Sequence, residues 1–127
     1  MTGPRRSLVA VVDDDFRVLE SLEELLVSAG HSVRQFSYAK SLLEDACLSE
    51  IDCLIADIGM PVVDGFELQR LVRDTRPELP VLFITARHEP VDRARAEGSQ
   101  GFFQKPFDGP ALLAAVAQAI QSSHREI

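Results

Sequence analysis

Three consecutive aspartates, Asp13, Asp14 and Asp15, close a short apolar run that begins at Leu8. Like charges this close repel one another and raise one another's pKa, so the arrangement needs a compensating partner. Two kinds of partner are available: the free N–H groups at the start of a following helix, or a bound divalent cation. A helix cap is structural, whereas a cation site serves binding or chemistry, so the remaining polar groups must decide between them.

Other polar side chains follow other apolar runs of the chain. Asp57 comes after CLIA, Thr85 after VLFI and Lys105 after GFFQ. Asp57 is hard to explain as a helix cap, because the residues after it lead into a proline turn. The carboxyl ends of parallel strands in an open α/β sheet line a crevice in which ligands bind. We therefore expect these acid, hydroxyl and ammonium groups to converge at one edge of a sheet.

The chemistry of these groups fits phosphoryl transfer. Clustered carboxylates suit Mg²⁺, which also keeps positions for water and a phosphoryl oxygen. A carboxylate can attack phosphorus and form an aspartyl phosphate. The transfer then needs positioning and neutralisation of charge on the phosphoryl oxygens. A metal ion, the Lys105 ammonium and the Thr85 hydroxyl could supply that neutralisation.

Apolar runs and helical patterns alternate five times along the chain. The runs are near-continuous, which is typical of a parallel sheet covered by helices on both faces. The run at 31–36 is more polar, so we expect it at an edge of the sheet. The predicted strands are residues 8–12, 31–36, 52–57, 80–85 and 101–104. The first predicted helix is 15–29, and the second is a short helix capped by Ser37 whose apolar stripe is Leu42, Leu43, Ala46 and Cys47. The third is capped by Asp64 and ends before Pro77, the fourth is 90–97, and the fifth is capped by Asp108.

The predicted helix at 90–97 is unusually short. Pro90 suits its first position and Gly98 its C-terminal stop. Its apolar residues are only Val91, Ala94 and Ala96. We expect this helix to bury little surface and to rank among the least stable parts of the domain.

Composition sets broad limits on function. A chain of 127 residues with 46% hydrophobic and 26% charged residues is typical of one globular domain. The net charge of −7 argues against direct nucleic-acid binding and against an anionic membrane surface. No apolar stretch is long enough for a membrane span or fits a signal peptide. Cys47 and Cys53 form no CxxC motif, so we expect two buried thiols in a reducing, cytoplasmic compartment.

The motifs VVDDD, LIADIGMPVVDG, VLFITA and GFFQKPF occur in this order from about Leu8 to Ile120. Together they resemble the receiver domain of bacterial two-component response regulators. The resemblance implies an α/β, three-layer, flavodoxin-like (βα)5 fold whose five-stranded parallel sheet has the order 2-1-3-4-5. It also implies that residues 1–127 form a single receiver domain with a core of about 8–122.

The resemblance implies a role for each polar group at the predicted edge. Asp57 would be the phosphoacceptor. Asp15 is expected to cap the first helix for a separate reason, since an aspartate that follows a strand often caps the next helix. A cis peptide bond would precede Pro106, as X-Pro chemistry allows. The Mg²⁺ (or Mn²⁺) ligands would be Asp13, Asp14, Asp57 and the backbone carbonyl of Gly59, and the phosphate-binding and switch residues would be Thr85, Ala86, Lys105 and Phe102.

The implied function is a phosphorylation-activated signalling switch rather than a turnover enzyme. A histidine kinase or phosphotransfer protein would donate the phosphoryl group, and the face formed by the fourth helix, fifth strand and fifth helix would be remodelled. The output could be a downstream domain, a protein partner or a phosphorylation-dependent homodimer. No helix-turn-helix pattern follows the last predicted helix, so we expect either a stand-alone receiver or the first domain of a longer regulator.

Three alternatives were weighed against this interpretation. A small Mg²⁺-dependent phosphohydrolase that forms an aspartyl phosphate, as in the haloacid dehalogenase type, would use the Asp-x-Asp spacing of Asp13 and Asp15. However, Phe16 and Arg17 follow where such enzymes need Thr or Val, and no cap domain is present. A degenerate receiver that only binds partners is disfavoured by the complete set of acids, Thr85 and Lys105. A P-loop NTPase is excluded because GxxxxGK[ST] is absent.

Overall fold

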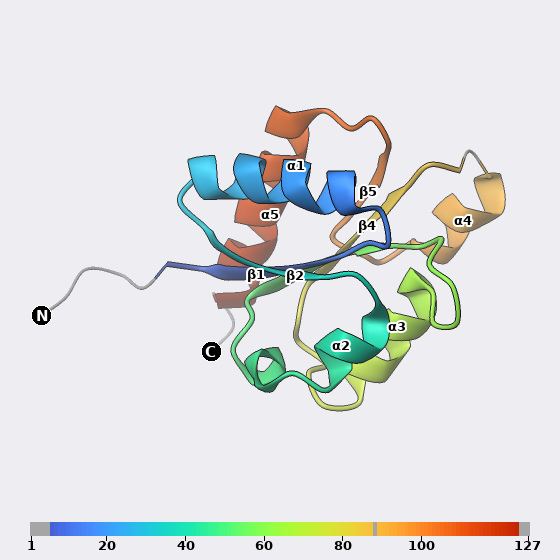
Figure 1. The fold of residues 1–127 in the computed structure, drawn as a ribbon, viewed down its shortest axis with the longest axis horizontal. Helices are drawn as coiled ribbons and strands as arrows, with labels where there is room; N and C mark the ends of the chain where they lie inside the picture. Colours follow the sequence, from blue (N-terminus) through green and yellow to red (C-terminus); the bar gives the residue numbers. More distant parts are fainter. Residues whose placement is uncertain (1–5, 88, 125–127) are drawn as a thin grey trace, which may run out of the picture.

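A computed structural model describes residues 6–87 and 89–124, and it confirms the three-layer α/β fold (Figure 1). Five parallel strands form one sheet in the order β2-β1-β3-β4-β5. The polar strand β2 lies at an edge, as its composition predicts. The strands are β1 (Leu8–Val12), β2 (Ser32–Phe36), β3 (Cys53–Asp57), β4 (Val81–Thr85) and β5 (Gly101–Gln104), and the helices are α1 (Phe16–Ser28), α2 (Ala39–Leu43), the 3₁₀ helix η1 (Ala46–Ser49), α3 (Gly65–Arg73), α4 (Pro90–Arg95) and α5 (Gly109–His124).

The sheet separates two apolar cores, because successive side chains of a strand point to opposite faces. Helices α1 and α5 cover one face, where Leu22 and Leu26 pack with Leu112 and Val116. Helices α2 and α3 cover the other face, where the ring of Phe66 lies 4.8 Å from that of Phe83. The central strands β1, β3 and β4 are almost entirely buried, which explains their continuous apolar sequences.

Three aspartates cap helices as the sequence predicts. Asp15 accepts a hydrogen bond from the N–H of Arg17 (2.9 Å), Asp64 from that of Glu67 (2.8 Å), and Asp108 from that of Ala111 (3.2 Å). Each bond satisfies an N–H group that the first turn of a helix leaves free. Asp15 therefore has the structural role that distinguishes it from the two aspartates before it.

The segment after β2 corrects one prediction. Tyr38, not Ser37, is the residue before α2, and no side chain caps this helix. The helix ends at Leu43, and Asp45 starts the separate helix η1 by accepting from the N–H of Cys47 at 2.8 Å. Ala46 is exposed, so the predicted stripe does not continue through it.

Helix α4 is even shorter than the sequence predicts. It begins at Pro90 as expected but ends at Arg95, so it has six residues. Only Ala96 of its three apolar residues is buried, while Val91 is 59% exposed. The other inward-facing residue is Asp92, which the apolar pattern did not identify.

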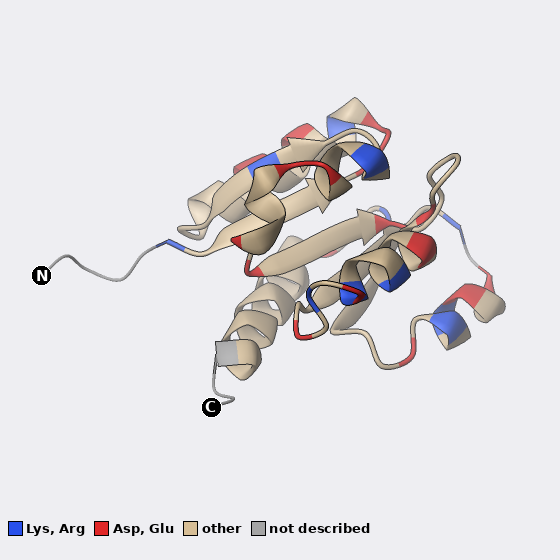
Figure 2. Cartoon of the chain, turned by 90° about the horizontal axis from the view of Figure 1, so that it is seen from below, with Lys and Arg blue, Asp and Glu red and all other residues tan. Residues whose placement is uncertain are grey.

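Charged residues lie mainly on helices and loops, and the strands carry few (Figure 2). Acidic and basic residues are interspersed along these helices and loops. None of the helices in the described part of the chain has the length and apolarity needed to cross a lipid bilayer.

Candidate functional site

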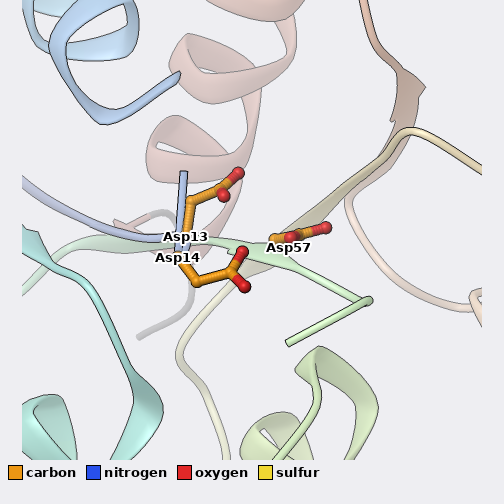
Figure 3. Close-up of side chains that lie close together, drawn as sticks. All are labelled: Asp13, Asp14 and Asp57. Atoms are coloured by element: carbon orange, nitrogen blue, oxygen red, sulfur yellow. The ribbon is translucent and has the colours of Figure 1, made fainter. Parts of the chain in front are cut away.

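Three carboxylates come together at the carboxyl edge of the sheet. Strands β1 and β3 are neighbours, and the pairing of Val12 with Ala56 places Asp13 and Asp57 side by side one residue further along. Asp13, Asp14 and Asp57 each offer an oxygen within 4.8 Å of the others (Figure 3). Asp13 is fully buried and Asp57 is 6% exposed, whereas Asp14 faces solvent. The cluster is therefore open on one side only.

Backbone hydrogen bonds fix the two buried acids. The N–H of Asp13 donates to the carbonyl of Phe36 at 3.1 Å, and Asp13 Oδ1 accepts from the N–H of Asp15 at 2.8 Å. Asp57 Oδ1 accepts from the N–H of Gly59 at 3.2 Å. These backbone bonds orient each carboxylate without help from a ligand.

The loop after β3 approaches the phosphoacceptor candidate closely. A Cβ atom on Gly65 would lie 2.7 Å from the carbonyl oxygen of Asp57, a distance that no side chain tolerates. Glycine at this position lets the start of α3 pack directly under the site. The DG pair in the motif MPVVDG therefore has a structural function for both residues, since Asp64 caps the same helix.

Lys105 adds a cation to the three acids. Its Nζ lies 2.8 Å from Oδ2 of Asp13 and 3.7 Å from Oδ2 of Asp57, and its side chain is 17% exposed. The peptide bond between Lys105 and Pro106 is cis, as the resemblance implies. The backbone N–H of Lys105 donates to the carbonyl of Thr85 at 2.7 Å, which ties this loop to the end of β4.

The pKa values of Asp13 and Lys105 are both perturbed. Burial raises the pKa of the Asp13 carboxyl, and the charge of Asp57 acts in the same direction, against the lowering effect of Lys105 and of the Asp15 N–H. Burial lowers the pKa of Lys105, but its contact with Asp13 and the charges of both acids outweigh burial and raise it. Lys105 therefore stays protonated while it faces the acids.

Thr85 is fully buried at the end of β4. Its Oγ1 accepts a hydrogen bond from the N–H of Arg87 at 2.9 Å, and Ala86 between them is exposed. Phe102 lies on the neighbouring strand β5 and is half-buried, with the guanidinium of Arg93 5.0 Å from the centre of its ring. The hydroxyl and the aromatic ring thus lie on adjacent strands, as predicted.

The acid cluster fits a small divalent cation. Its donors are hard carboxylate oxygens from the ends of β1 and β3, and the cluster is partly open to solvent. Mg²⁺ and Mn²⁺ prefer such oxygen ligands and leave positions for water and phosphate. Gly59, whose carbonyl the resemblance adds to this set, lies two residues beyond Asp57.

The order of the strands, the acid cluster and the cation after β5 match a known family. Residues 9–117 match the response regulator receiver domain. The chain belongs to this family. Receivers are signalling domains of two-component systems.

Similar proteins and structures agree with this assignment. The response regulator protein TodT of Pseudomonas putida F1 is 36% identical over 119 residues, covering 92% of this chain and 52% of TodT. The structure of the response regulator StyR has a TM-score of 0.83 at 38% identity, covering 94% of this chain and 62% of StyR. The chemotaxis protein CheY4 of Vibrio cholerae has a TM-score of 0.80 at 27% identity, covering 91% and 99%. The chain thus spans about half the length of TodT and nearly all of CheY4.

Two features of this receiver were not predicted from the sequence. Val62 has a left-handed backbone with φ of 67° and a fully exposed side chain in the loop between Asp57 and α3. Asp92 is 2% exposed on α4 and forms an ion pair with Arg87 at 2.9 Å. The only signal for Asp92 was its spacing of four residues from Ala96, which places both residues on one helical face.

Proposed function

We propose that this receiver is a phosphorylation-activated switch and that Asp57 is its phosphoacceptor. The observation that carries the proposal is the position of Asp57: a buried carboxylate at the end of β3, beside Asp13 and 3.7 Å from the ammonium of Lys105. In this environment a transferred phosphoryl group would meet positive charge from Lys105 and a hydroxyl from Thr85. Residues 8–122 make up the working domain in this proposal.

The chemical step is a transfer between two nucleophiles. A carboxylate oxygen of Asp57 attacks phosphorus, a P–O bond forms, and the P–N bond to the imidazole of the donor histidine breaks. The product is an acyl phosphate whose extra negative charge lies next to Lys105. Positioning and charge neutralisation account for most of the rate of such a step.

The metal in this proposal is Mg²⁺ or Mn²⁺, held by Asp13, Asp14, Asp57 and the carbonyl of Gly59. Bound there, it would neutralise charge on the phosphoryl oxygens and offset the repulsion among the three acids. The support for this set is the cluster of hard oxygen donors described above. Lys105 and the metal would then share the charge of the acids.

The signal would leave the site through Thr85 and Phe102. The hydroxyl of Thr85 would move towards the phosphoryl group together with Ala86, and the ring of Phe102 would turn into the space released. The half-buried state of Phe102 and its position opposite Phe83 in the sheet support this route. The surface of α4, β5 and α5 would change as a result, because a charge-changing modification biases a two-state element.

The partners in this proposal are a histidine kinase or phosphotransfer protein in the cytoplasm and a downstream output. A cleft of about 450 Å³ is lined by residues of α1 and by Lys105, Pro106 and Phe107, and we expect the donor protein to approach there. The exposed ring of Phe16 lies at the start of α1. Since TodT and StyR are longer than this chain, the output could be a further domain, a protein partner or a second copy.

Incubation with acetyl phosphate and Mg²⁺, followed by intact-protein mass spectrometry, tests the proposal. The expected result is one added phosphate per chain that persists after the donor is removed. Steady phosphate release from many phosphate esters would instead support the alternative phosphohydrolase. No added phosphate and no release would contradict both functions.

A further inference from the structure

Arg87 joins the switch residue Thr85 to helix α4. Its backbone N–H donates to Thr85 Oγ1 at 2.9 Å, and its carbonyl accepts from the side-chain amide of Gln104 at 3.3 Å. Its guanidinium donates to Oδ1 of Asp92 at 2.9 Å. One residue is thus bonded to the end of β4, to β5 and to α4.

Asp92 is an unusual partner for a surface arginine. The side chain of Asp92 is 2% exposed, whereas that of Arg87 is 47% exposed. The second oxygen of Asp92, Oδ2, is buried and accepts no hydrogen bond from any residue in the described part of the chain. A buried carboxylate with one unsatisfied oxygen is costly, and it depends on its ion pair with Arg87.

Arg87 is also placed to serve a second anion. It lies two residues beyond Thr85, and β4 pairs directly with β3, the strand that ends in Asp57. Its side chain is 47% exposed, and guanidinium groups bind phosphoryl oxygens in a two-pronged geometry. In this structure the guanidinium instead bonds to Asp92 on α4.

We infer that Asp92 is a positioning residue that keeps Arg87 away from the phosphorylation site, and that Arg87 exchanges Asp92 for the phosphoryl group once Asp57 is modified. This inference rests on the proposed phosphorylation of Asp57. The exchange leaves the carboxylate of Asp92 buried without a cation, so α4 has to move to hydrate it. Phosphorylation is thereby coupled to α4 by a second route, separate from the ring of Phe102.

The short helix α4 is suited to such a response. It has six residues, and besides Asp92 its segment buries only Ala96. Two of its arginines lie over aromatic rings, Arg93 over Phe102 at 5.0 Å and Arg95 over Phe66 at 4.2 Å. Little apolar surface therefore opposes its displacement.

A double-mutant cycle tests the exchange, with beryllium fluoride and Mg²⁺ as the probe for the phosphoryl group. Calorimetric titration is carried out on wild type, Asp92→Asn, Arg87→Met and the double variant. Asp92→Asn releases Arg87, so we expect the apparent Kd for the probe to fall by about tenfold or more, the size of one charge-assisted hydrogen bond. In the Arg87→Met background, the same Asp92 change should leave the Kd unaltered.

Glu97→Gln is the matched control, since it removes one exposed acid from the same segment and should not change the Kd. An equal effect of Asp92→Asn in both arginine backgrounds, or no effect in either, would overturn the inference. Wild type that binds no beryllium fluoride and gains no phosphate would contradict the proposed function itself, so the two failures are distinguishable.

Hydrogen exchange on wild type gives a second test that needs no variant. With beryllium fluoride and Mg²⁺ bound, the amides of Asp92 and Ala96 should exchange faster, because α4 loses its link to Arg87. The amides of Leu22 and Leu26 in α1 serve as the internal reference. Unchanged or slower exchange at Asp92 and Ala96 in the bound state would overturn the inference.

Discussion

The ammonium of Lys105 lies closer to Asp13 than to Asp57, with Nζ 2.8 Å from Oδ2 of Asp13 and 3.7 Å from Oδ2 of Asp57. Asp13 is the fully buried member of the acid cluster, so this contact compensates the charge that water cannot reach. Lys105 therefore stabilises the domain in addition to its proposed role beside the phosphoryl group.

Lys105→Met should destabilise the domain in buffer that contains a chelator. Removing the cation from a buried carboxylate costs about 3 kcal/mol of the free energy of unfolding. Added Mg²⁺ should raise the melting temperature more in the variant than in wild type, because the metal replaces the lost charge. Lys40→Met, which removes an exposed ion pair with Glu44, is the control and should change neither value measurably. Equal stability of Lys105→Met and wild type in chelator would contradict the argument.

Gly59→Asn should shorten the lifetime of the aspartyl phosphate. The wild-type residue has no amide or acid to orient a hydrolytic water, so we expect slow autodephosphorylation. A Cβ atom at Gly59 would meet only Asp57 Oδ1, at 3.8 Å, so asparagine fits without strain. We expect decay to accelerate roughly tenfold through better positioning of the water. Phosphate release after removal of acetyl phosphate measures the rate.

Gly59→Ala is the matched control, since it adds a side chain but no amide, and its decay should match that of wild type. Loss of the phosphate from wild-type protein in less than a few seconds would contradict the expected slow autodephosphorylation. Decay of Gly59→Asn at the wild-type rate would contradict it as well.

Val62→Gly should stabilise the domain. A β-branched residue with φ of 67° is strained, and its fully exposed side chain loses no packing when it is removed. Relief of this strain should raise the free energy of unfolding by about 1 kcal/mol. Urea denaturation measures the change. Val62→Thr keeps the branched Cβ and should show no gain, and a destabilised Val62→Gly would contradict the assigned strain.

Both thiols should be unreactive in the folded protein. Burial raises the pKa of Cys53 to about 12, and burial together with Asp45 raises that of Cys47 to about 11. Only the thiolate reacts, so labelling with a disulfide reagent at pH 8 should be slow until denaturant is added. Rapid labelling of either cysteine in native protein would contradict this prediction.

The same pKa values affect stability at high pH. Unfolded thiols ionise from about pH 8.5, whereas the folded thiols stay protonated. The free energy of unfolding should therefore fall as the pH rises above that value towards 11 and 12.

Most of the fold could be predicted from the sequence, because its strands are buried on both faces. Continuous apolar runs such as LVAVV and CLIAD have few alternative structures. The helices capped by Asp15 and Asp64 begin directly after those residues. The acids, Thr85 and Lys105 could be placed together because each follows a strand of the same parallel sheet.

The errors occur where tertiary contacts outweigh local pattern. Ser37 had the chemistry of a cap, but the chain turns one residue later and the helix stops before Ala46. Asp92 had the composition of a surface residue, yet Arg87 from a neighbouring loop allows it to be buried. The spacing of Asp92 from Ala96 indicates a shared helical face, but an ion pair between a loop and a helix leaves no periodic signal, so Arg87 could not be predicted as the partner.

Identifying the phosphorylated residue is the most direct test of the proposed phosphorylation switch. Wild type, Asp57→Asn and Asp74→Asn are incubated with acetyl phosphate and Mg²⁺, and intact masses and peptide masses are measured over time. Wild type and Asp74→Asn, which alters an exposed acid after α3, should each gain one phosphate on the peptide that contains Asp57. Asp57→Asn should gain none, since it keeps the shape but lacks the nucleophile. An Asn variant that gains phosphate at a comparable rate would show that Asp57 is not the phosphoacceptor.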